Sequence, residues 1–307
     1  MRYFITGGFG LIGSALTNSV KGDITILSRS NSNRERIKRS GFTVILKELS
    51  KVTLRNLEGV DVIYHCASTV DNYNVLTDPY IDIKTNLNGT IHLLELCKKL
   101  KKKPKFIYLS TFFVYGNAYE KTHIPVDEET KTDPLAIYPA TKLCAENIIK
   151  LYSRLYDIPY IICRLTNVYG EHESFTNKKK GALNYLIMKA VKNEEIAVYK
   201  DGNYYRDYIY TDDVVSALLF LEKKVENDLF LVGFGSSVRF KEIIKAVIML
   251  SKSKSLIKKI DPPGCNKIVG TTDFIADTTK LNKLGWTAKI DYKEGLEKII
   301  NRYKTII

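Results

Sequence analysis

The chain lacks any apolar run long enough to cross a membrane. Of its 307 residues 45% are hydrophobic, yet no uninterrupted apolar stretch approaches the roughly 18 residues that a spanning helix needs. Its first residues enter an apolar run directly, without the charged segment and cleavage site of a secretory leader. We therefore expect a globular protein that stays in the cytoplasm and binds no membrane.

The sequence also lacks the spacings of a metal site or a disulfide framework. Its cysteines are odd in number and widely separated, and no C-x-x-C pair occurs. Its histidines stand at no ligand spacing from one another or from cysteine. We expect no bound metal, and reduced structural thiols at Cys66, Cys97, Cys144, Cys163 and Cys265.

Acidic residues are too few to balance the lysines and arginines, and the formal net charge is +13 at pH 7. The cations are scattered or stand in short runs, such as 98–103 and 178–180, and form no long basic stretch. We interpret them as a solvated, lysine-rich surface that binds no nucleic acid. The excess positive potential would help to gather a phosphorylated small substrate.

The N-terminal segment runs from an apolar stretch into a glycine-rich turn. Residues 3–5 are Tyr-Phe-Ile, and residues 6–13 are Thr-Gly-Gly-Phe-Gly-Leu-Ile-Gly. Gly8, Gly10 and Gly13 fit the pattern G-x-G-x-x-G at a strand-to-helix turn. Glycine is needed because the chain turns tightly, a pyrophosphate contacts the backbone, and the helix lies close to the strand. This context favours a dinucleotide site at a helix N-terminus over an ordinary tight turn.

Further apolar runs alternate with helical patterns through the first half of the chain. Strands are predicted at 23–27, 42–46, 60–65, 105–109 and 160–165, and long helices at 78–97 and 138–156. Such alternation implies right-handed crossovers and a parallel sheet. The predicted fold class is α/β, a Rossmann-type doubly wound parallel sheet with a smaller C-terminal lobe.

Beyond residue 166 the alternation of strands and helices loosens, which indicates a second lobe. We predict a dinucleotide-binding domain over residues 1–166, with 207–232 returning to it. Residues 167–206 and 233–307 are predicted to form the substrate-binding lobe. We find no internal repeat and no low-complexity linker.

The second predicted strand ends at Ser28-Arg29. In an NAD site an acidic residue near this point holds the ribose hydroxyls, whereas an arginine can hold the 2′-phosphate of NADP. Because the acid is absent and Arg29 is present, the sequence favours NADP(H), with NAD(H) as the alternative. A solvated arginine among Arg34, Arg36 and Arg39 would give the same pattern without any cofactor contact.

Taken in order, the motifs resemble those of the extended short-chain dehydrogenases/reductases, in the nucleotide-sugar epimerase/dehydratase group. The resemblance covers essentially the whole chain, and the order of the motifs is more specific than any one of them. The motifs are the glycine turn, Asp61 to Ala67, Asn86 in Asn-Leu-Asn-Gly-Thr, Ser110-Thr111 before Val114-Tyr115-Gly116, Tyr138-x-x-x-Lys142, Arg164-x-x-Asn167-Val168-Tyr169-Gly170, Arg206-Asp207-Tyr208 and Leu284-Gly285-Trp286.

The resemblance implies a catalytic group of three residues. Tyr138 would be the acid or base, Lys142 would hold the nicotinamide ribose, and Thr111 would hydrogen-bond the reacting sugar oxygen. Tyrosine has a pKa near 10, too high for a base at neutral pH. A fixed ammonium nearby and a positively charged oxidised nicotinamide would both favour the phenolate.

The resemblance also implies the binding residues and a homodimer. Glu48 would meet the adenine amino group, and Ala67 would line the cofactor through its backbone. Asn167 and Arg206 would hold the substrate diphosphate, since a guanidinium suits phosphate oxygens; a surface salt bridge is the alternative for Arg206. The cofactor would be contacted by Gly7, Gly10, Leu11, Ile12, Gly13, Ser28, Arg29, Glu48, Leu49, Ala67, Asn86 and Lys142.

Two departures from the family pattern bear on the reaction. Dehydratases carry an acidic residue, often Asp-Glu, just after the catalytic Thr or Ser, and Phe112-Phe113 stand there in this chain, which disfavours dehydration. The pair Ser28-Arg29 favours NADPH as the cofactor. NADPH in turn favours net reduction, because a reductase consumes its hydride whereas an epimerase returns it. The sequence narrowly favours a nucleotide-sugar 4-ketoreductase, with a UDP-glucose 4-epimerase-like enzyme as the alternative. A non-catalytic dinucleotide-binding protein is a remote third reading.

Overall fold

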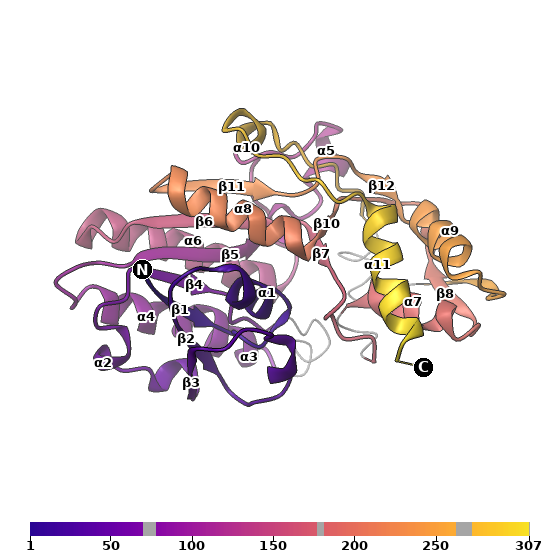
Figure 1. Ribbon diagram of the computed structural model, residues 1–307. Coiled ribbons are helices and arrows are strands. Elements are labelled where there is room, and N and C mark those ends of the chain that lie inside the picture. The colour runs from indigo at the N-terminus through magenta and orange to yellow at the C-terminus, as the bar shows by residue number, and fades with distance from the viewer. Residues whose placement is uncertain (70–77, 177–180, 262–271, 307) are drawn as a thin grey trace. The chain divides into compact units, whose positions relative to one another are not determined.

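A seven-stranded sheet lies at the centre of the fold (Figure 1). The computed structural model describes residues 1–69, 78–176, 181–261 and 272–306. The order across the sheet is β11-β6-β5-β4-β1-β2-β3. The strands are β1 Arg2–Thr6, β2 Asp23–Ser28, β3 Phe42–Leu46, β4 Val62–His65, β5 Lys105–Thr111, β6 Tyr160–Leu165 and β11 Asp228–Val232.

The order in which strands are added to the sheet changes side at β1. The chain first adds β2 and β3 on one side of β1 and then adds β4 on the other side, and all these neighbouring strands pair in parallel. Thr6 aligns with Leu27 on β2 and with His65 on β4. The segments that follow these strands therefore emerge at one edge of the sheet, which is where ligands bind in doubly wound folds. The predicted fold class is confirmed.

The strands are apolar on both faces because helices flank the sheet. On one face Phe4, Ile63 and Phe106 are fully buried in a cluster that includes Leu94 and Ile149 from two helices. The helices over the first part of the chain and around β11 are α1 Leu11–Ser19, α2 Leu54–Leu57, α3 Tyr80–Asp82, α4 Gly89–Cys97, α6 Ile137–Tyr156 and α8 Thr211–Lys224, with single 3-10 turns at Arg34–Arg36, Leu49–Lys51 and Phe112–Tyr115.

The helix predicted over residues 78–97 is not uniform. Between α3 and α4 the backbone adopts a π-helix over Ile83–Asn88. The wider turn changes which side chains share a face, and π turns are frequent at functional positions. Here the turn carries Asn86, whose side chain is 1% exposed.

The chain divides into two compact units. The first consists of Met1–Val114, Ala136–Arg164 and Val215–Phe230, and the second of Tyr115–Leu135, Leu165–Val214 and Leu231–Ile307. Residues 115–135, within the span predicted for the dinucleotide-binding domain, thus belong to the second unit.

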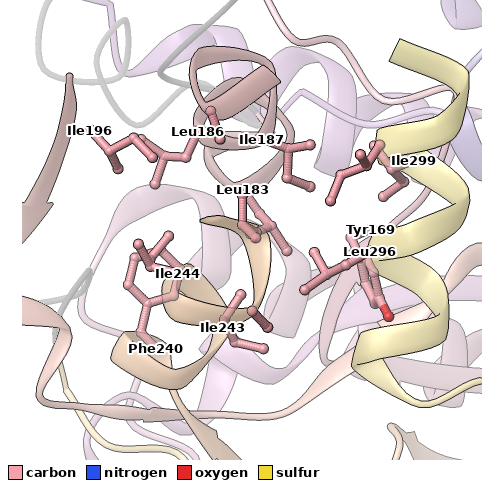
Figure 2. Close-up of a cluster of buried hydrophobic side chains, with 14 of the residues drawn as sticks. Tyr169, Leu183, Leu186, Ile187, Ile196, Phe240, Ile243, Ile244, Leu296 and Ile299 are labelled. Atoms are coloured by element: carbon pink, nitrogen blue, oxygen red, sulfur yellow. The ribbon is translucent and has the colours of Figure 1, made fainter. Parts of the chain in front are cut away.

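The second unit has a core of its own, formed largely by three helices (Figure 2). Leu183 and Ile187 pack there with Ile243 and with Leu296. Short two-stranded pairs join β10 to β7, β12 to β9 and β13 to β8. The elements are α5 Ala118–Thr122, β7 Asn167–Tyr169, α7 Ala182–Val191, β8 Ile196–Tyr199, a 3-10 turn at Lys200–Gly202, β9 Tyr205–Arg206, β10 Tyr208–Tyr210, β12 Val238–Arg239, α9 Phe240–Ser251, β13 Ile257–Ile260, α10 Thr279–Lys283 and α11 Tyr292–Lys304.

Three further expectations concern thiols, membranes and metals. Cys66, Cys97, Cys144 and Cys163 are free thiols, while Cys265 and the lysine run 178–180 lie outside the described residues. Among the helices that the structure describes, none combines the length and apolar character needed to span a bilayer. In the same part of the chain, no three His, Cys, Asp or Glu side chains gather as a metal ion would require.

Candidate active site

The glycine turn after β1 is packed so closely that side chains would fill it. Gly7 has a φ of +65°, and a Cβ there would lie 2.9 Å from the backbone of Ala67. A Cβ on Gly13 would lie 2.3 Å from the carbonyl oxygen of Gly7, and one on Gly8 would lie 2.3 Å from the Ile26 side chain. By contrast, apart from its two chain neighbours the only described atom near a Cβ on Gly10 is the Gly7 oxygen, at 3.1 Å.

The first turn of α1 begins directly after Gly10, at Leu11 and Ile12. The first four N–H groups of an α-helix have no partner within the helix. A helix N-terminus beside bare, closely packed backbone suits the pyrophosphate of a dinucleotide. The residues present therefore fit the cofactor that the sequence predicted.

A buried histidine braces this turn, and sequence reasoning assigned it no role. His65 Nδ1 is hydrogen-bonded to Thr6 Oγ1 at 2.7 Å, and its Nε2 to Thr90 Oγ1 at 3.0 Å. Thr6 Oγ1 also accepts the backbone N–H of Ala67 at 3.0 Å. Burial lowers the pKa of His65 to about 3, so the ring is neutral and joins β1, β4 and α4 as a structural link.

Of the residues predicted at the adenosine end, Arg29 and Glu48 are exposed, whereas Ser28 and Leu49 are half-buried. Ser28 donates its hydroxyl to the Ser30 carbonyl at 2.8 Å, and Arg29 is exposed. Glu48 forms an exposed ion pair with Lys84 at 3.6 Å, and the Leu49 side chain would lie 2.7 Å from a Cβ placed on Gly89.

A second arginine lies nearer to the glycine turn than the sequence indicated. Arg36 Nη1 donates to the Phe9 carbonyl at 3.4 Å. The Asn18 side chain fixes this segment to α1, because it donates to the Arg36 carbonyl and accepts the Lys38 N–H, both at 2.9 Å. These contacts join residues far apart in sequence, so local patterns could not predict them.

Asn86 fixes the backbone that follows β4. Its Oδ1 accepts from Ser68 Oγ and from the Thr69 N–H, both at 2.9 Å. Its Nδ2 donates to the Thr69 carbonyl at 3.2 Å and to Thr141 Oγ1 at 3.4 Å. The structure thus gives Asn86 a part in holding this segment, and its cofactor contact stays a prediction.

The three predicted catalytic residues meet within the first unit. The side chains of Thr111 and Ser68 lie close enough to the Tyr138 phenol to lower its pKa. One turn later on α6, Lys142 is 1% exposed, and its Nζ lies 4.1 Å from the centroid of the Tyr108 ring. The contact with Ser68, one residue after Ala67, links this group to the glycine turn.

Burial dominates the titration of the two ionisable members of this group. It raises the pKa of the Tyr138 phenol to about 12, against the Thr111 and Ser68 side chains, which lower it. It lowers the pKa of Lys142 to about 7, although Glu146 and other neighbours raise it. The protein alone therefore keeps Tyr138 protonated, and the phenolate predicted from the sequence depends on the positive charge of an oxidised nicotinamide.

An aromatic pair follows Thr111. The rings of Phe112 and Phe113 stack with centroids 4.2 Å apart, and the Phe113 N–H donates to Thr111 Oγ1 at 3.3 Å. The position next to Thr111 thus presents aromatic carbon where elimination would need a second acid or base.

The predicted substrate residues lie in the second unit and are tied to Asp207. Asn167 donates its N–H to the Asp207 carbonyl at 3.1 Å and its side-chain amide to the same oxygen at 2.8 Å. The Asp207 carboxylate accepts from Thr166 Oγ1 and from the N–H groups of Phe234 and Gly235. This network, which the sequence did not reveal, holds Asn167 beside the segment that carries Arg206.

Arg206 is buried rather than paired at the surface. It is 4% exposed, its Nη1 donates to the Tyr205 carbonyl at 3.0 Å, and its guanidinium carbon lies 5.2 Å from the Tyr204 ring centroid. Burial lowers its pKa, but arginine keeps its charge in proteins. A buried cation of this kind suits an anionic ligand.

Comparisons with known proteins show which family and fold this chain resembles. The family described as NAD dependent epimerase/dehydratase matches residues 3–233. A Methanocaldococcus jannaschii protein named "Putative UDP-glucose 4-epimerase" is 31% identical over 98% of this chain and 97% of its own length. The crystal structure of UDP-glucose 4-epimerase with UDP-glucose from Thermotoga maritima is 25% identical, with a TM-score of 0.91 over 100% of this chain and 99% of that chain. The Thermus thermophilus UDP-glucose 4-epimerase complex with NAD, 22% identical, shares the fold with a TM-score of 0.87 over 100% of both chains.

Proposed function

Because this chain belongs to the NAD-dependent epimerase/dehydratase family of extended short-chain dehydrogenases/reductases, we propose that it moves a hydride at the sugar ring of a nucleoside-diphosphate sugar. One observation carries the proposal. The phenol of Tyr138 lies near the Thr111 and Ser68 side chains, and Ala67, the residue before Ser68, is hydrogen-bonded to Thr6 at the glycine turn that would hold a dinucleotide.

Each residue has a distinct part in the proposed chemistry. A nicotinamide dinucleotide, when bound, supplies and stores the hydride. The Lys142 ammonium donates hydrogen bonds that orient its ribose. Tyr138 Oη takes the proton of the sugar hydroxyl as the adjacent carbon is oxidised, and returns it when that carbon is reduced. The Thr111 hydroxyl holds the reacting oxygen in place.

We propose that the reaction is epimerisation at C4. The preference for a 4-ketoreductase rested on Ser28-Arg29 and Phe112-Phe113, whereas the named relatives are 4-epimerases. A non-catalytic role is disfavoured because Thr111, Tyr138 and Lys142 are all present and assembled. The test is incubation with UDP-glucose and oxidised nicotinamide cofactor, without added NADPH. Formation of UDP-galactose supports the proposal, and stoichiometric oxidation of NADPH with a 4-keto-6-deoxy sugar nucleotide as the sole activity would contradict it.

We propose that the second unit binds the nucleotide sugar. The guanidinium of Arg206 and the amide of Asn167 are suited to phosphate oxygens. The first unit would hold the dinucleotide, and the family resemblance leads us to propose a homodimer. The base and the sugar are left open by this proposal, with UDP-glucose as the first substrate to try.

We propose that NADP(H) binds more tightly than NAD(H), because Arg29 follows β2 where an acid would hold the ribose. Arg29→Ala should reduce this preference about tenfold to a hundredfold, since a charge-assisted hydrogen bond contributes about 1.5–3 kcal/mol. Fluorescence titration with NADPH and NADH measures both affinities. Arg55→Ala, an exposed arginine on α2, is the control and should leave the ratio unchanged. Equal affinities in the unmodified protein would contradict the proposal.

A further inference from the structure

Two oppositely charged residues are buried together behind the catalytic group. Glu146 on α6 is 0% exposed and Arg164 on β6 is 4% exposed. Arg164 Nη2 donates to Glu146 Oε2 at 2.7 Å, and its Nε lies 3.2 Å from both carboxylate oxygens. Ser110 on β5 donates its hydroxyl to the same carboxylate. Three elements of the first unit therefore meet at one side chain.

Glu146, Arg164 and Ser110 adjoin both elements that carry the catalytic group, β5 with Thr111 and α6 with Lys142. Ser110 is the residue before Thr111, so the hydrogen bond to Glu146 holds the end of β5. Glu146 follows Lys142 by four positions on α6, a spacing that places the two side chains on one helix face. Glu146 thus contacts Ser110, the residue before Thr111, and lies on the same helix as Lys142.

Several titratable groups face Lys142. They are Glu146 on α6, Tyr108 on β5, His65 and Cys66 at the end of β4, and Asp82 on α3. A lysine buried among apolar groups loses its proton unless an opposite charge lies near. Burial lowers the pKa of Lys142 to about 7, and Glu146 is the foremost of the neighbours that raise it.

We propose that Glu146, held by Arg164 and Ser110, is a positioning residue that fixes α6 against β5 and sustains the ammonium of Lys142 while a nicotinamide ribose is bound. The inference rests on the proposed function in assigning that ribose to Lys142. Stability alone is a weak reason for such a pair, because a buried ion pair is seldom more stabilising than apolar side chains of similar size.

The test measures how pH changes the affinity of the full chain for NADPH and NADH, by fluorescence titration from pH 6 to 9. In the unmodified protein affinity should fall as pH rises through the pKa of Lys142, because the ammonium donors are lost. Glu146→Gln removes the carboxylate and should move this midpoint about one to three pH units lower, so that affinity is already weakened at pH 6 and changes little from there to pH 9. Arg164→Gln removes the cation that pairs with Glu146. The carboxylate then acts on Lys142 alone, which should move the midpoint higher.

Glu222→Gln is the matched control. Glu222 is a buried carboxylate on α8 that accepts from Tyr3 at 3.2 Å and from Tyr64, and its loss should leave the midpoint unchanged. Thermal unfolding shows which variants are folded. If a single variant does not fold, the double variant Glu146→Gln/Arg164→Gln is used in its place, because it leaves neither charge unpaired.

The outcomes separate this inference from the proposed function. Folded Glu146 or Arg164 variants with the midpoint of the unmodified protein would overturn the positioning role. An unmodified protein that binds neither NADPH nor NADH at any of these pH values would instead overturn the proposed function.

Discussion

Replacing Tyr138 with phenylalanine is expected to lower turnover about 10²–10⁴-fold, the usual contribution of a positioned acid or base. The ring stays in its buried site, so packing is kept, but the phenol oxygen near Thr111 and Ser68 is lost. Affinity for the nicotinamide cofactor should remain unchanged, because Lys142 and the glycine turn are intact. Turnover of a nucleotide sugar and cofactor titration, made on the same preparation, measure the two effects separately.

A matched control lies on the same helix. Tyr152 on α6 donates its hydroxyl to Glu95 and has no place in the proposed chemistry. Tyr152→Phe removes the same atom from the same residue type and should leave turnover near that of the unmodified protein. Near-normal turnover in Tyr138→Phe, or an equal loss in both variants, would be incompatible with the assigned role.

Replacing Gly13 with alanine should remove most cofactor binding. The new Cβ would lie 2.3 Å from the Gly7 oxygen and 2.8 Å from the Gly8 Cα, so α1 must move away from the turn. If two charge-assisted hydrogen bonds from N–H groups to the pyrophosphate are lost, affinity falls by about 3–6 kcal/mol, roughly a hundredfold to ten-thousandfold. Stability should fall by about 1–3 kcal/mol from overpacking.

Gly41 provides the control for this substitution. It has a φ of +75°, but apart from its two chain neighbours no described atom lies within 4 Å of a Cβ placed there. Gly41→Ala should therefore cost some stability through backbone strain and leave cofactor affinity unchanged. Unaltered affinity in folded Gly13→Ala would mean that the turn does not hold the pyrophosphate.

Much of the first unit could be predicted because its signals are local. Strands at Phe42–Leu46 and Tyr160–Leu165 have the predicted bounds, since each is a short apolar run. The glycine turn could be predicted because its spaced glycines are required only where backbone segments approach closely. The grouping of Tyr138 and Lys142 followed from helical spacing alone, whereas their roles stay predictions.

What the sequence did not reveal depends on contacts between distant segments. The apolar spacing of residues 83–97 fits an ordinary helix, so the π turn at Ile83–Asn88 could not be anticipated. Glu146 lies on an amphipathic helix where a carboxylate is usually solvated, and only the tertiary fold brings Arg164 to it. His65 likewise acquires its role from Thr6 and Thr90, which are separated from it along the chain.

The central claim is that the hydride removed from C4 returns to C4 of the same sugar. The most direct measurement uses UDP-glucose carrying deuterium at C4, with mass spectrometry and NMR of the products and absorbance at the nicotinamide band. The account predicts UDP-galactose that retains deuterium at C4, with no net change in reduced cofactor. Deuterium released in the cofactor pool, or one NADPH oxidised for every product formed, would contradict it.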